Sequence, residues 1–320
     1  MSELRKLGNS DLALTSIGVG AWAIGGGGWA FAWGKQDDND SVAAIQAMIH
    51  QGVNWIDTAP VYGFGHSEEV VGRAIKGLEK KPYIFTKCAR RWNDQGEIVK
   101  IIKRDSIIEE CENSLKRLGV DTIDLYQMHW PEPDEDIEEG WGAMAELQKQ
   151  GKVRWIGVSN YSIAQLKRAQ AIAPITSLQP PYSMISPEIA TETLPFCLAH
   201  NIGTLVYSPM KAGLLTGAMT KERAESLPAD DWRRRNPAFH EPNLSRNLAL
   251  VELLRGIAEP HGRTPGEVAV AWTLHNPAVT AAIVGVRSAK QVDGVIGALN
   301  FRLSEREFTL IEQYRVTNGF

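Results

Sequence analysis

Four side chains with complementary acid–base chemistry follow strand-like segments in the first half of the chain. Asp57, Lys87 and His129 each end an apolar run, and Tyr62 lies shortly after Asp57. Each has a plain structural explanation when taken alone: a turn cap, an ion pair without catalysis, or a satisfied core histidine. Four such groups at the ends of neighbouring strands are far less expected by chance, so we interpret them as one site.

These four residues together can donate a proton to a carbonyl oxygen. A tyrosine titrates at about pH 10, and we expect the Lys87 ammonium to lower the pKa of Tyr62 by favouring its phenolate. Asp57 would keep Lys87 charged, since a buried cation needs a partner, and His129 would hydrogen-bond the substrate carbonyl. The carbonyl carbon also needs hydride, which no side chain supplies. The residues therefore predict a nicotinamide cofactor beside them.

Alternating strands and helices place these residues together. Apolar runs bounded by Gly, Pro or Asp predict the strands, and capping residues predict the helices between them. Asp40 or Ser41 is expected to cap one helix and Ser67 the next, while Thr264-Pro265-Gly266-Glu267 combines an N-cap, a first-turn Pro and a capping-box Glu. The predicted strands are 17–20, 53–57, 83–87, 123–129, 153–159, 176–179, 204–207 and 281–285.

Eight strand–helix units with apolar strands predict an α/β fold. We expect a closed (β/α)8 TIM barrel with an N-terminal β-hairpin at residues 4–15 and extra helices after strands 7 and 8. An open doubly wound sheet is the alternative. The glycine run 25–28 counts against it, because the run lacks the spacing of a dinucleotide-binding loop. No linker divides the chain, so residues 1–320 are interpreted as a single domain.

Two loops contain unusual residue types. The segment 21–34 combines glycines with the aromatic residues Trp22, Trp29, Phe31 and Trp33. We interpret it as a pocket wall, because large apolar groups are seldom left in water without use. The run Arg233-Arg234-Arg235 lies in a long excursion at residues 208–244. It is interpreted as a solvated loop and not as a functional patch, as short charge runs usually are.

The 320-residue chain has 34 Lys and Arg against 38 Asp and Glu, a formal net charge of −4. This mild acidity argues against a nucleic-acid or anionic-membrane surface. Cys88, Cys111 and Cys197 are scattered without metal-ligand spacing, so we expect free thiols, a reducing compartment and no metal site. The first residues lack a signal-peptide core, and no run is long enough to span a bilayer. A cytoplasmic location is therefore expected.

These segments resemble the aldo-keto reductase family over nearly the whole chain. The resemblance rests on the motifs Asp57-Thr58-Ala59-Pro60-Val61-Tyr62-Gly63, Lys87 at a strand end, Asp124-Leu125-Tyr126-Gln127-Met128-His129-Trp130, Gly157-Val158-Ser159-Asn160 and Tyr207-Ser208-Pro209-Met210. In that family the residues matching Asp57, Tyr62, Lys87 and His129 form the catalytic tetrad, with the tyrosine as general acid. The resemblance implies reversible reduction of an aldehyde or ketone to an alcohol, with NADPH (NADP+) bound extended over the strand ends.

The resemblance also implies which residues bind the cofactor. Ser159, Asn160 and Gln179 match positions that hold the nicotinamide carboxamide, and Tyr207 matches the position that stacks on the nicotinamide ring. The other implied cofactor contacts are Trp22, Asp57, the pyrophosphate-covering residues Ser208, Pro209, Met210, Gly213, Leu214 and Gly217, and the residues Gly285, Arg287 and Gln291 near the adenosine 2′-phosphate.

Arg287 can offer a charge-assisted pair of donors to the 2′-phosphate, which favours NADPH over NADH. The chain departs from the family pattern close to this point. Gly294 and Val295 stand where many members have an acidic residue and then Asn against the adenine amine. We expect this departure to weaken the adenine contacts.

Aromatic side chains are expected to wall the substrate pocket, namely Trp22, Trp33, Trp92 and Trp130. Such walls suit an apolar carbonyl compound or the faces of a sugar ring. Besides this small-molecule substrate, we expect no nucleic-acid or membrane partner and a monomer or weak homo-oligomer. The physiological substrate and the preferred direction of the reaction are left open.

Two other functions remain as alternatives. The short-tailed plan resembles the bacterial sugar- and aldehyde-reducing branches and also the potassium-channel β-subunit branch. A cofactor-sensing binding subunit that turns over slowly is therefore the main alternative. A Schiff-base lyase that uses Lys87 as nucleophile is another, and Asp57 argues against it by keeping the lysine protonated.

Overall fold

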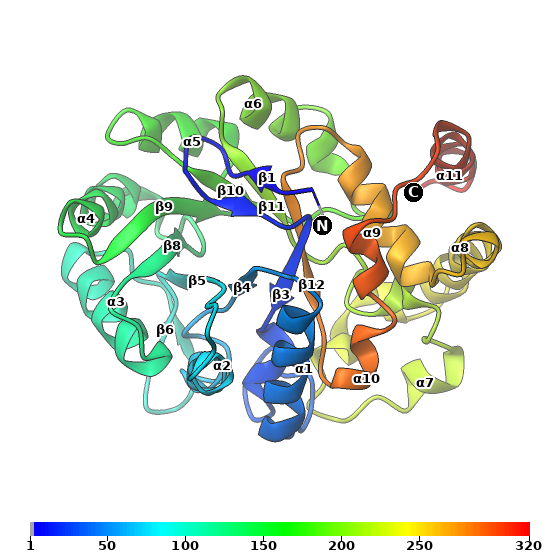
Figure 1. The fold of residues 1–320 in the computed structure, drawn as a ribbon, viewed down its shortest axis with the longest axis horizontal. Coiled ribbons are helices and arrows are strands. Elements are labelled where there is room, and N and C mark those ends of the chain that lie inside the picture. Colours follow the sequence, from blue (N-terminus) through cyan, green and yellow to red (C-terminus); the bar gives the residue numbers. More distant parts are fainter. Residues whose placement is uncertain (1–2) are drawn as a thin grey trace.

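The computed structural model describes residues 3–320, in which eight parallel strands close into a barrel with helices around it (Figure 1). Barrel order follows chain order, and the last strand pairs with the first, with Gly285 opposite Gly20. The predicted (β/α)8 TIM barrel is confirmed. Its strands are β3 (Ile17–Gly20), β4 (Trp55–Asp57), β5 (Tyr83–Cys88), β8 (Ile123–Met128), β9 (Val153–Ser159), β10 (Ser177–Gln179), β11 (Gly203–Val206) and β12 (Ala281–Gly285).

An α-helix follows each of the first six barrel strands: α1 (Asp38–His50), α2 (His66–Ile75), α3 (Arg104–Leu118), α4 (Ile137–Lys149), α5 (Ile163–Gln170) and α6 (Thr193–Ala199). The extra helices predicted beyond the last two strands are present as α7 (Lys221–Glu225), α8 (Asn243–Ala258), α9 (Pro265–His275), α10 (Ala289–Val292) and α11 (Glu305–Thr317). Short 3₁₀ turns lie at Trp22–Gly25, Asp134–Asp136, Glu188–Ala190, Leu214–Thr216, Trp232–Arg235, Pro237–Phe239, Glu259–His261 and Ile296–Leu299.

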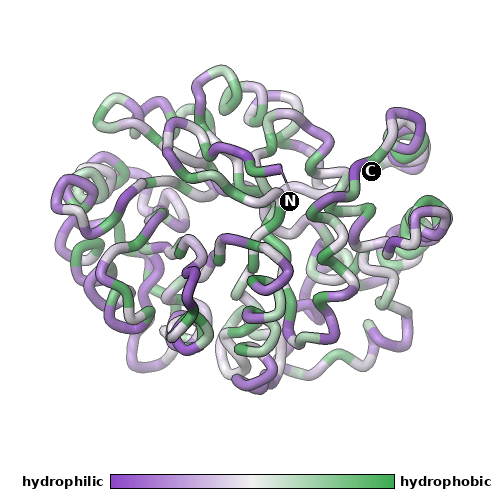
Figure 2. Tube along the Cα trace, in the orientation of Figure 1, coloured by the Kyte–Doolittle hydropathy of each residue, from purple (hydrophilic) through white to green (hydrophobic). Residues whose placement is uncertain are grey.

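The outer helices bury one face against the barrel. In α4 the apolar residues Ile137, Trp141, Met144 and Leu147 recur at helical spacing, and all four are fully buried. Figure 2 shows the same mixture of hydrophobic and hydrophilic residues along the other outer helices. This one-sided burial holds the strand ends, and therefore the mouth of the barrel, in place.

The predicted N-terminal hairpin closes the bottom of the barrel. Leu7 and Leu12 are fully buried in one cluster with the barrel residues Trp55 and Phe85, and each buried leucine stabilises the fold by about 1.5–3 kcal/mol. Gly18 makes room for this packing, since a Cβ at that position would lie 2.1 Å from the Trp55 ring. The hairpin strands are β1 (Arg5–Lys6) and β2 (Ala13–Leu14).

Two predicted N-caps are wrong. Asp37 caps α1, a few residues before the predicted Asp40 or Ser41, because its side chain accepts the first backbone N–H groups of the helix. Ser67 lies inside α2, fully buried, and donates a 2.9 Å hydrogen bond to the Ala21 carbonyl. Ser67 therefore ties α2 to the loop after β3 and caps nothing.

Other local signals are confirmed. The capping box of Thr264 is present at the start of α9, and Gly119 ends α3 with a φ of 64°. A short hairpin after β5 was not predicted, and it consists of β6 (Arg91–Trp92) and β7 (Ile98–Val99). Among residues 3–320, the helices are all too short or too polar to cross a membrane.

Candidate active site

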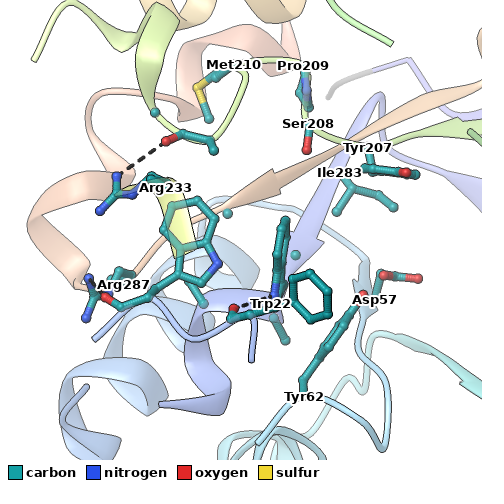
Figure 3. Close-up of a pocket in the computed structure, with 18 of the residues that line it drawn as sticks. Trp22, Asp57, Tyr62, Tyr207, Ser208, Pro209, Met210, Arg233, Ile283 and Arg287 are labelled. Atoms are coloured by element: carbon teal, nitrogen blue, oxygen red, sulfur yellow. Dashed lines mark hydrogen bonds between the residues drawn. The ribbon is translucent and has the colours of Figure 1, made fainter. Parts of the chain in front are cut away.

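A cavity of about 810 Å³ opens at the carboxyl ends of the barrel strands. Five barrel strands contribute their last residue to its lining, namely Gly20, Asp57, Ser159, Gln179 and Gly285. Figure 3 shows Arg287 at one end of the cavity and Asp57 and Tyr62 at the other, with Trp22 between them. Ligand pockets in proteins usually have volumes of about 300–1,000 Å³, so this cavity is large enough for an extended ligand.

Lys87 and Asp57 form an ion pair at the floor of the cavity. Lys87 Nζ lies 2.6 Å from Asp57 Oδ1, and the two side chains are 0% and 4% exposed. The ammonium also donates to the Thr58 carbonyl at 2.9 Å and to the Tyr62 hydroxyl oxygen at 3.4 Å. Burial lowers the pKa of Lys87, and Asp57 opposes this shift. Three acceptors thus use all three ammonium hydrogens and fix the orientation of the charge.

Tyr62 lies between this ion pair and His129. Because Lys87 donates to the Tyr62 hydroxyl oxygen, the phenolic hydrogen remains available for an acceptor in the cavity that Tyr62 lines. The Tyr62 ring packs edge-to-face on the His129 ring, with centroids 5.7 Å apart. The predicted convergence of Asp57, Tyr62, Lys87 and His129 on one part of the cavity is therefore present.

The predicted direction of the Tyr62 pKa shift is wrong. Burial raises the pKa of Tyr62 well above its usual value, and the negative charge of Asp57 raises it further. The Lys87 charge does not reverse this, because Asp57 neutralises it at shorter range. Tyr62 is therefore a protonated phenol at neutral pH, which is the form that can give up a proton.

His129 is a neutral imidazole at physiological pH. Burial lowers the pKa of His129 well below its usual value, and the positive charges of Lys87 and Arg90 lower it further. Its Nδ1 is buried without a hydrogen-bond partner within residues 3–320. A neutral imidazole has one donor and one acceptor nitrogen, so His129 can hydrogen-bond a ligand without adding charge.

Two buried amides satisfy the second oxygen of Asp57. Gln127 and Gln179 donate to Asp57 Oδ2 at 3.1 and 2.8 Å, and Gln179 also donates to Gln127 Oε1 at 3.1 Å. Gln127 was missed by the sequence prediction. The sequence signal for Gln127 is its position two residues before His129, because alternate residues of an extended segment point to the same side.

The residues predicted to hold the nicotinamide form a connected hydrogen-bonded chain. Tyr207 Oη donates to Asn160 Oδ1 at 2.9 Å, Asn160 Nδ2 donates to Ser159 Oγ at 3.0 Å, and Ser159 Oγ donates to the Gln179 carbonyl at 2.8 Å. Asn160 adopts a left-handed backbone, with a φ of 62°, which asparagine tolerates better than most residues. All four residues line the cavity.

Arg287 is bonded to the aromatic loop at the opposite end of the cavity. Its Nε donates to Gln36 Oε1 at 2.7 Å and its Nη1 to the Trp33 carbonyl at 3.1 Å. Gln36 Nε2 returns a 2.7 Å bond to the Arg287 carbonyl, and Gln291 Oε1 accepts the Arg287 backbone N–H at 2.8 Å. Arg287 therefore holds the loop as well as facing the cavity.

This end of the cavity is positively charged. Arg223, Arg287 and Lys290 line the cavity. Arg223 donates to the Ala218 carbonyl, and Arg287 donates to Gln36 Oε1 and the Trp33 carbonyl, so within residues 3–320 these hydrogen bonds leave both charges without a carboxylate partner. Burial lowers the pKa of Arg287, as does the nearby positive charge of Arg233. Gly294 and Val295, where the chain departs from the family pattern, line the same end.

The loop after β11 forms another wall, with Ser208, Pro209 and Met210 facing the cavity in Figure 3. Gly213 joins them, but the predicted contacts Leu214 and Gly217 do not line the cavity. Leu214 is fully buried in a separate apolar cluster with Met219 and Phe239. That cluster anchors the loop from behind, so Leu214 supports the cavity wall without facing the cavity.

Comparison with known proteins agrees with this geometry. The model of the Aldo/keto reductase family matches residues 16–315. The chain belongs to the aldo/keto reductase family. It is 39% identical over 308 residues to "Aldo-keto reductase YhdN" of Bacillus subtilis (strain 168), covering 95% of this chain and 91% of the relative.

Two further aldo/keto reductase relatives have more specific names. The chain is 32% identical over 321 residues to the "NADH-specific methylglyoxal reductase" of Escherichia coli (strain K12), covering 96% of each chain. The structure of the glycerol dehydrogenase AKR11B4 from Gluconobacter oxydans superposes with a TM-score of 0.90 at 36% identity, covering 99% of this chain and 96% of that one. This chain is therefore an aldo/keto reductase related to oxidoreductases.

In this aldo/keto reductase, Arg233 is part of the cavity wall, and its interpretation as solvated loop is wrong. Its guanidinium pairs with Asp231 at 2.6 Å and lies 4.7 Å from the Trp33 ring centroid. The next ring, Trp232, stacks on Trp22 at 5.1 Å. Arg233 is 8% exposed, and these contacts join the loop after β11 to the loop after β3 above the cavity.

The predicted aromatic wall of the cavity is present except for one residue. Trp22, Trp33 and Trp130 line the cavity, and so do Trp29 and Phe31 of the loop that was predicted to be a pocket wall. Trp92 does not. Its ring packs on Phe64 with centroids 5.4 Å apart, whereas Ile98, the residue that pairs with Trp92 in the same hairpin, lines the cavity.

Proposed function

We propose that the chain is an NADPH-dependent carbonyl reductase that converts an aldehyde or ketone to an alcohol reversibly, with Tyr62 as the proton donor. The observation that carries the proposal is the use of the Lys87 hydrogens. Two of them go to Asp57 and Thr58, and the third goes to the Tyr62 oxygen. Tyr62 therefore has its own hydrogen to offer to a carbonyl oxygen in the cavity.

The chemistry of the cavity fits a nicotinamide dinucleotide. Glycines at both ends, Gly20, Gly213 and Gly285, let backbone groups approach a ligand closely. The cationic end with Arg287 suits phosphate groups, and the Tyr207 ring near the tetrad suits a flat aromatic ring. Bound there, NADPH would supply hydride to the carbonyl carbon.

The tetrad residues would divide the remaining work. Neutral His129 would orient the carbonyl by a hydrogen bond, and Tyr62 would release its proton to the carbonyl oxygen as charge develops on it. The phenolate left behind would then be stabilised by the Lys87 ammonium, whose orientation Asp57 fixes. A Schiff-base role for Lys87 is disfavoured, because Asp57 and two further acceptors occupy its ammonium in a fully buried position.

The proposed preference for NADPH over NADH is supported by positive side chains in the cavity that are not paired with carboxylates in the part of the chain that the structure describes. Arg223, Arg287 and Lys290 offer three cations to a 2′-phosphate at the far end of the cavity. One relative is named as NADH-specific, so measuring both cofactors is a direct test. We expect higher kcat/KM with NADPH.

The test of the reaction is a comparison of wild type with Tyr62→Phe in reducing small aldehydes with NADPH, followed by the loss of nicotinamide absorbance. A general acid contributes about 10²–10⁴-fold to the rate, so kcat should fall by that factor. Tyr62→Phe keeps the ring contacts with His129 and leaves Lys87 two of its three acceptors, so thermal stability should change little. A variant with full activity would remove Tyr62 as the acid.

A further inference from the structure

The cavity has a second charged group at its outer edge, which we call the charged rim and which consists of Arg90, Lys100 and Glu132. Arg90 Nη2 donates to Glu132 Oε2 at 2.6 Å, and Lys100 Nζ lies 3.0 Å from the same oxygen. Within the charged rim one carboxylate thus faces two cations. The buried Glu110 also acts on Arg90, but burial raises the pKa of Glu110 to about 7, so the rim keeps a positive charge in excess when Glu110 is protonated.

The charged rim adjoins the end of the cavity where Tyr62 lies. Arg90 follows Lys87 by three residues along the chain, and Trp130 follows His129 directly. The Arg90 guanidinium carbon lies 5.7 Å from the Trp130 ring centroid. Three residues span at most about 10 Å, so the Cα atoms of Lys87 and Arg90 lie within that distance of each other, and Tyr62, Arg90 and Trp130 line the same cavity.

Arg90 is held rigidly and is largely shielded from water. Its side chain is 9% exposed, against 59% for Lys100 and 42% for Glu132. Arg90 Nη1 donates to the Ala89 carbonyl at 3.0 Å, and burial lowers the pKa of Arg90. A guanidinium has five N–H donors. Within the described chain Arg90 uses one on each terminal nitrogen, so further donors remain for an incoming anion.

The charge of the rim differs from that of the protein as a whole. The chain has a formal net charge of −4, whereas the charged rim, near the end of the cavity where Tyr62 lies, is locally positive. The Trp130 ring lies against Arg90, and Trp29 and Phe31 line the same cavity. A matching ligand has an apolar body with a single negative charge.

We propose that the charged rim selects carbonyl substrates that bear a carboxylate, bound by Arg90 and Lys100. This substrate class rests on the proposed reductase function. One excess positive charge matches a singly charged carboxylate more closely than a doubly charged phosphate, and the planar guanidinium matches carboxylate geometry. Arg90 and Lys100 are thus specificity-determining residues.

The test compares kcat/KM for two aldehydes of closely similar shape, 4-carboxybenzaldehyde and its neutral methyl ester, methyl 4-formylbenzoate, with NADPH. We expect the acid to be preferred by about tenfold, as for one charge-assisted contact. The preference should shrink in about 0.5 M NaCl, where screening is strong. An acid-to-ester ratio of one or less overturns the proposal.

Two rim variants should change this ratio in opposite directions. Lys100→Gln removes an exposed cation and should lower the ratio by about threefold. Glu132→Gln removes the competing carboxylate and should raise the ratio. Lys103→Gln is the matched control, because Lys103 pairs with Asp136 and Glu139 and does not line the cavity. A ratio that stays the same in both rim variants also overturns the proposal.

A binding measurement separates failure of the substrate class from failure of the reaction. If neither aldehyde is reduced, the proposed reaction fails, and benzoate and benzamide are titrated against tryptophan fluorescence in the presence of NADP+. Tighter binding of benzoate in wild type, weakened in Lys100→Gln, supports the charged rim as a carboxylate site. Equal binding of the two compounds rejects it.

Discussion

Replacing Asp57 with asparagine should leave an uncompensated charge at the floor of the cavity. The substitution keeps the shape of the side chain but removes the negative charge that Lys87 meets at 2.6 Å. It also turns an oxygen into an NH2 group that faces the amide donors of Gln127 and Gln179. The new NH2 group and the amide NH2 groups of Gln127 and Gln179 are all donors and cannot hydrogen-bond one another. The hydrogen bonds to Asp57 Oδ2 are therefore lost unless one of the amides rotates by about 180°.

The size of the effect follows from burial. Removing one partner of a buried ion pair destabilises a protein by about 3–5 kcal/mol. The Lys87 and Asp57 side chains are 0% and 4% exposed, so water does not screen the remaining charge. We expect Asp57→Asn to lower the free energy of unfolding by about 4 kcal/mol at mildly acidic pH.

This loss should shrink as the pH rises. Burial already lowers the pKa of Lys87, and Asp57 is the main group that opposes the shift. Without Asp57, the folded-state pKa falls further below the unfolded value of about 10.4. Between these two values the unfolded chain binds one more proton than the folded one, so the stability of the variant rises with pH.

The assay is urea unfolding at about pH 6 and about pH 9.5, chosen to bracket the Lys87 titration and followed by tryptophan fluorescence. Asp105→Asn is the matched control, because Asp105 pairs with Arg104 but is 93% exposed. Exposed pairs contribute about 0–1 kcal/mol, so the control should stay close to wild type at both pH values. A loss for Asp57→Asn that is equal at both pH values would refute the buried-charge explanation.

Two further predictions concern Arg287 and Glu110. Arg287→Met should lower the ratio of kcat/KM for NADPH to that for NADH by at least about tenfold, the effect of losing a charged hydrogen bond; initial rates with both nucleotides check this, and an unchanged ratio would exclude Arg287 from cofactor choice. Burial raises the pKa of Glu110 to about 7, whereas a glutamate in the unfolded chain has a pKa of about 4.3. Ionisation of Glu110 therefore destabilises the fold above about pH 4.3, and this penalty grows until the pH passes the folded-state pKa. Glu110→Gln should therefore raise the free energy of unfolding by about 3.5 kcal/mol at pH 8 and by only about 1 kcal/mol at pH 5. Thermal melts at both values test this, and equal shifts would contradict it.

The strand ends were the most predictable part of the molecule. Asp57, Lys87 and His129 each follow an apolar run, and a parallel barrel brings such positions to one mouth whatever the loops do. Gln127 could have been found by the same logic, because it alternates with His129 along one strand. Local pattern and barrel geometry together were enough for these positions.

The loops were less predictable because their contacts are distant in sequence. Nothing in the run Arg233-Arg234-Arg235 distinguishes its first member, yet the Arg233 side chain pairs with Asp231, lies over the Trp33 ring and becomes buried. Trp92 has the composition of a wall residue, but an unpredicted hairpin turns it onto Phe64. These outcomes depend on tertiary packing and not on local residue type.

The acidity of Tyr62 could not be obtained from neighbouring charges alone. A nearby ammonium predicts a lower pKa, but the structure shows burial and the Asp57 charge acting the other way. The balance depends on how much water each group loses, and that quantity exists only in the folded chain.

The leucine-filled hairpin beneath the barrel affects the resupply of protons. Leu7 and Leu12 pack on Trp55 and Phe85, so an apolar plug separates Lys87 from the solvent below. A nucleotide and an aldehyde in the mouth would cover the upper side. We therefore expect Tyr62 to regain its hydrogen only as the alcohol departs, which would couple recharging of the phenol to product release in every catalytic cycle.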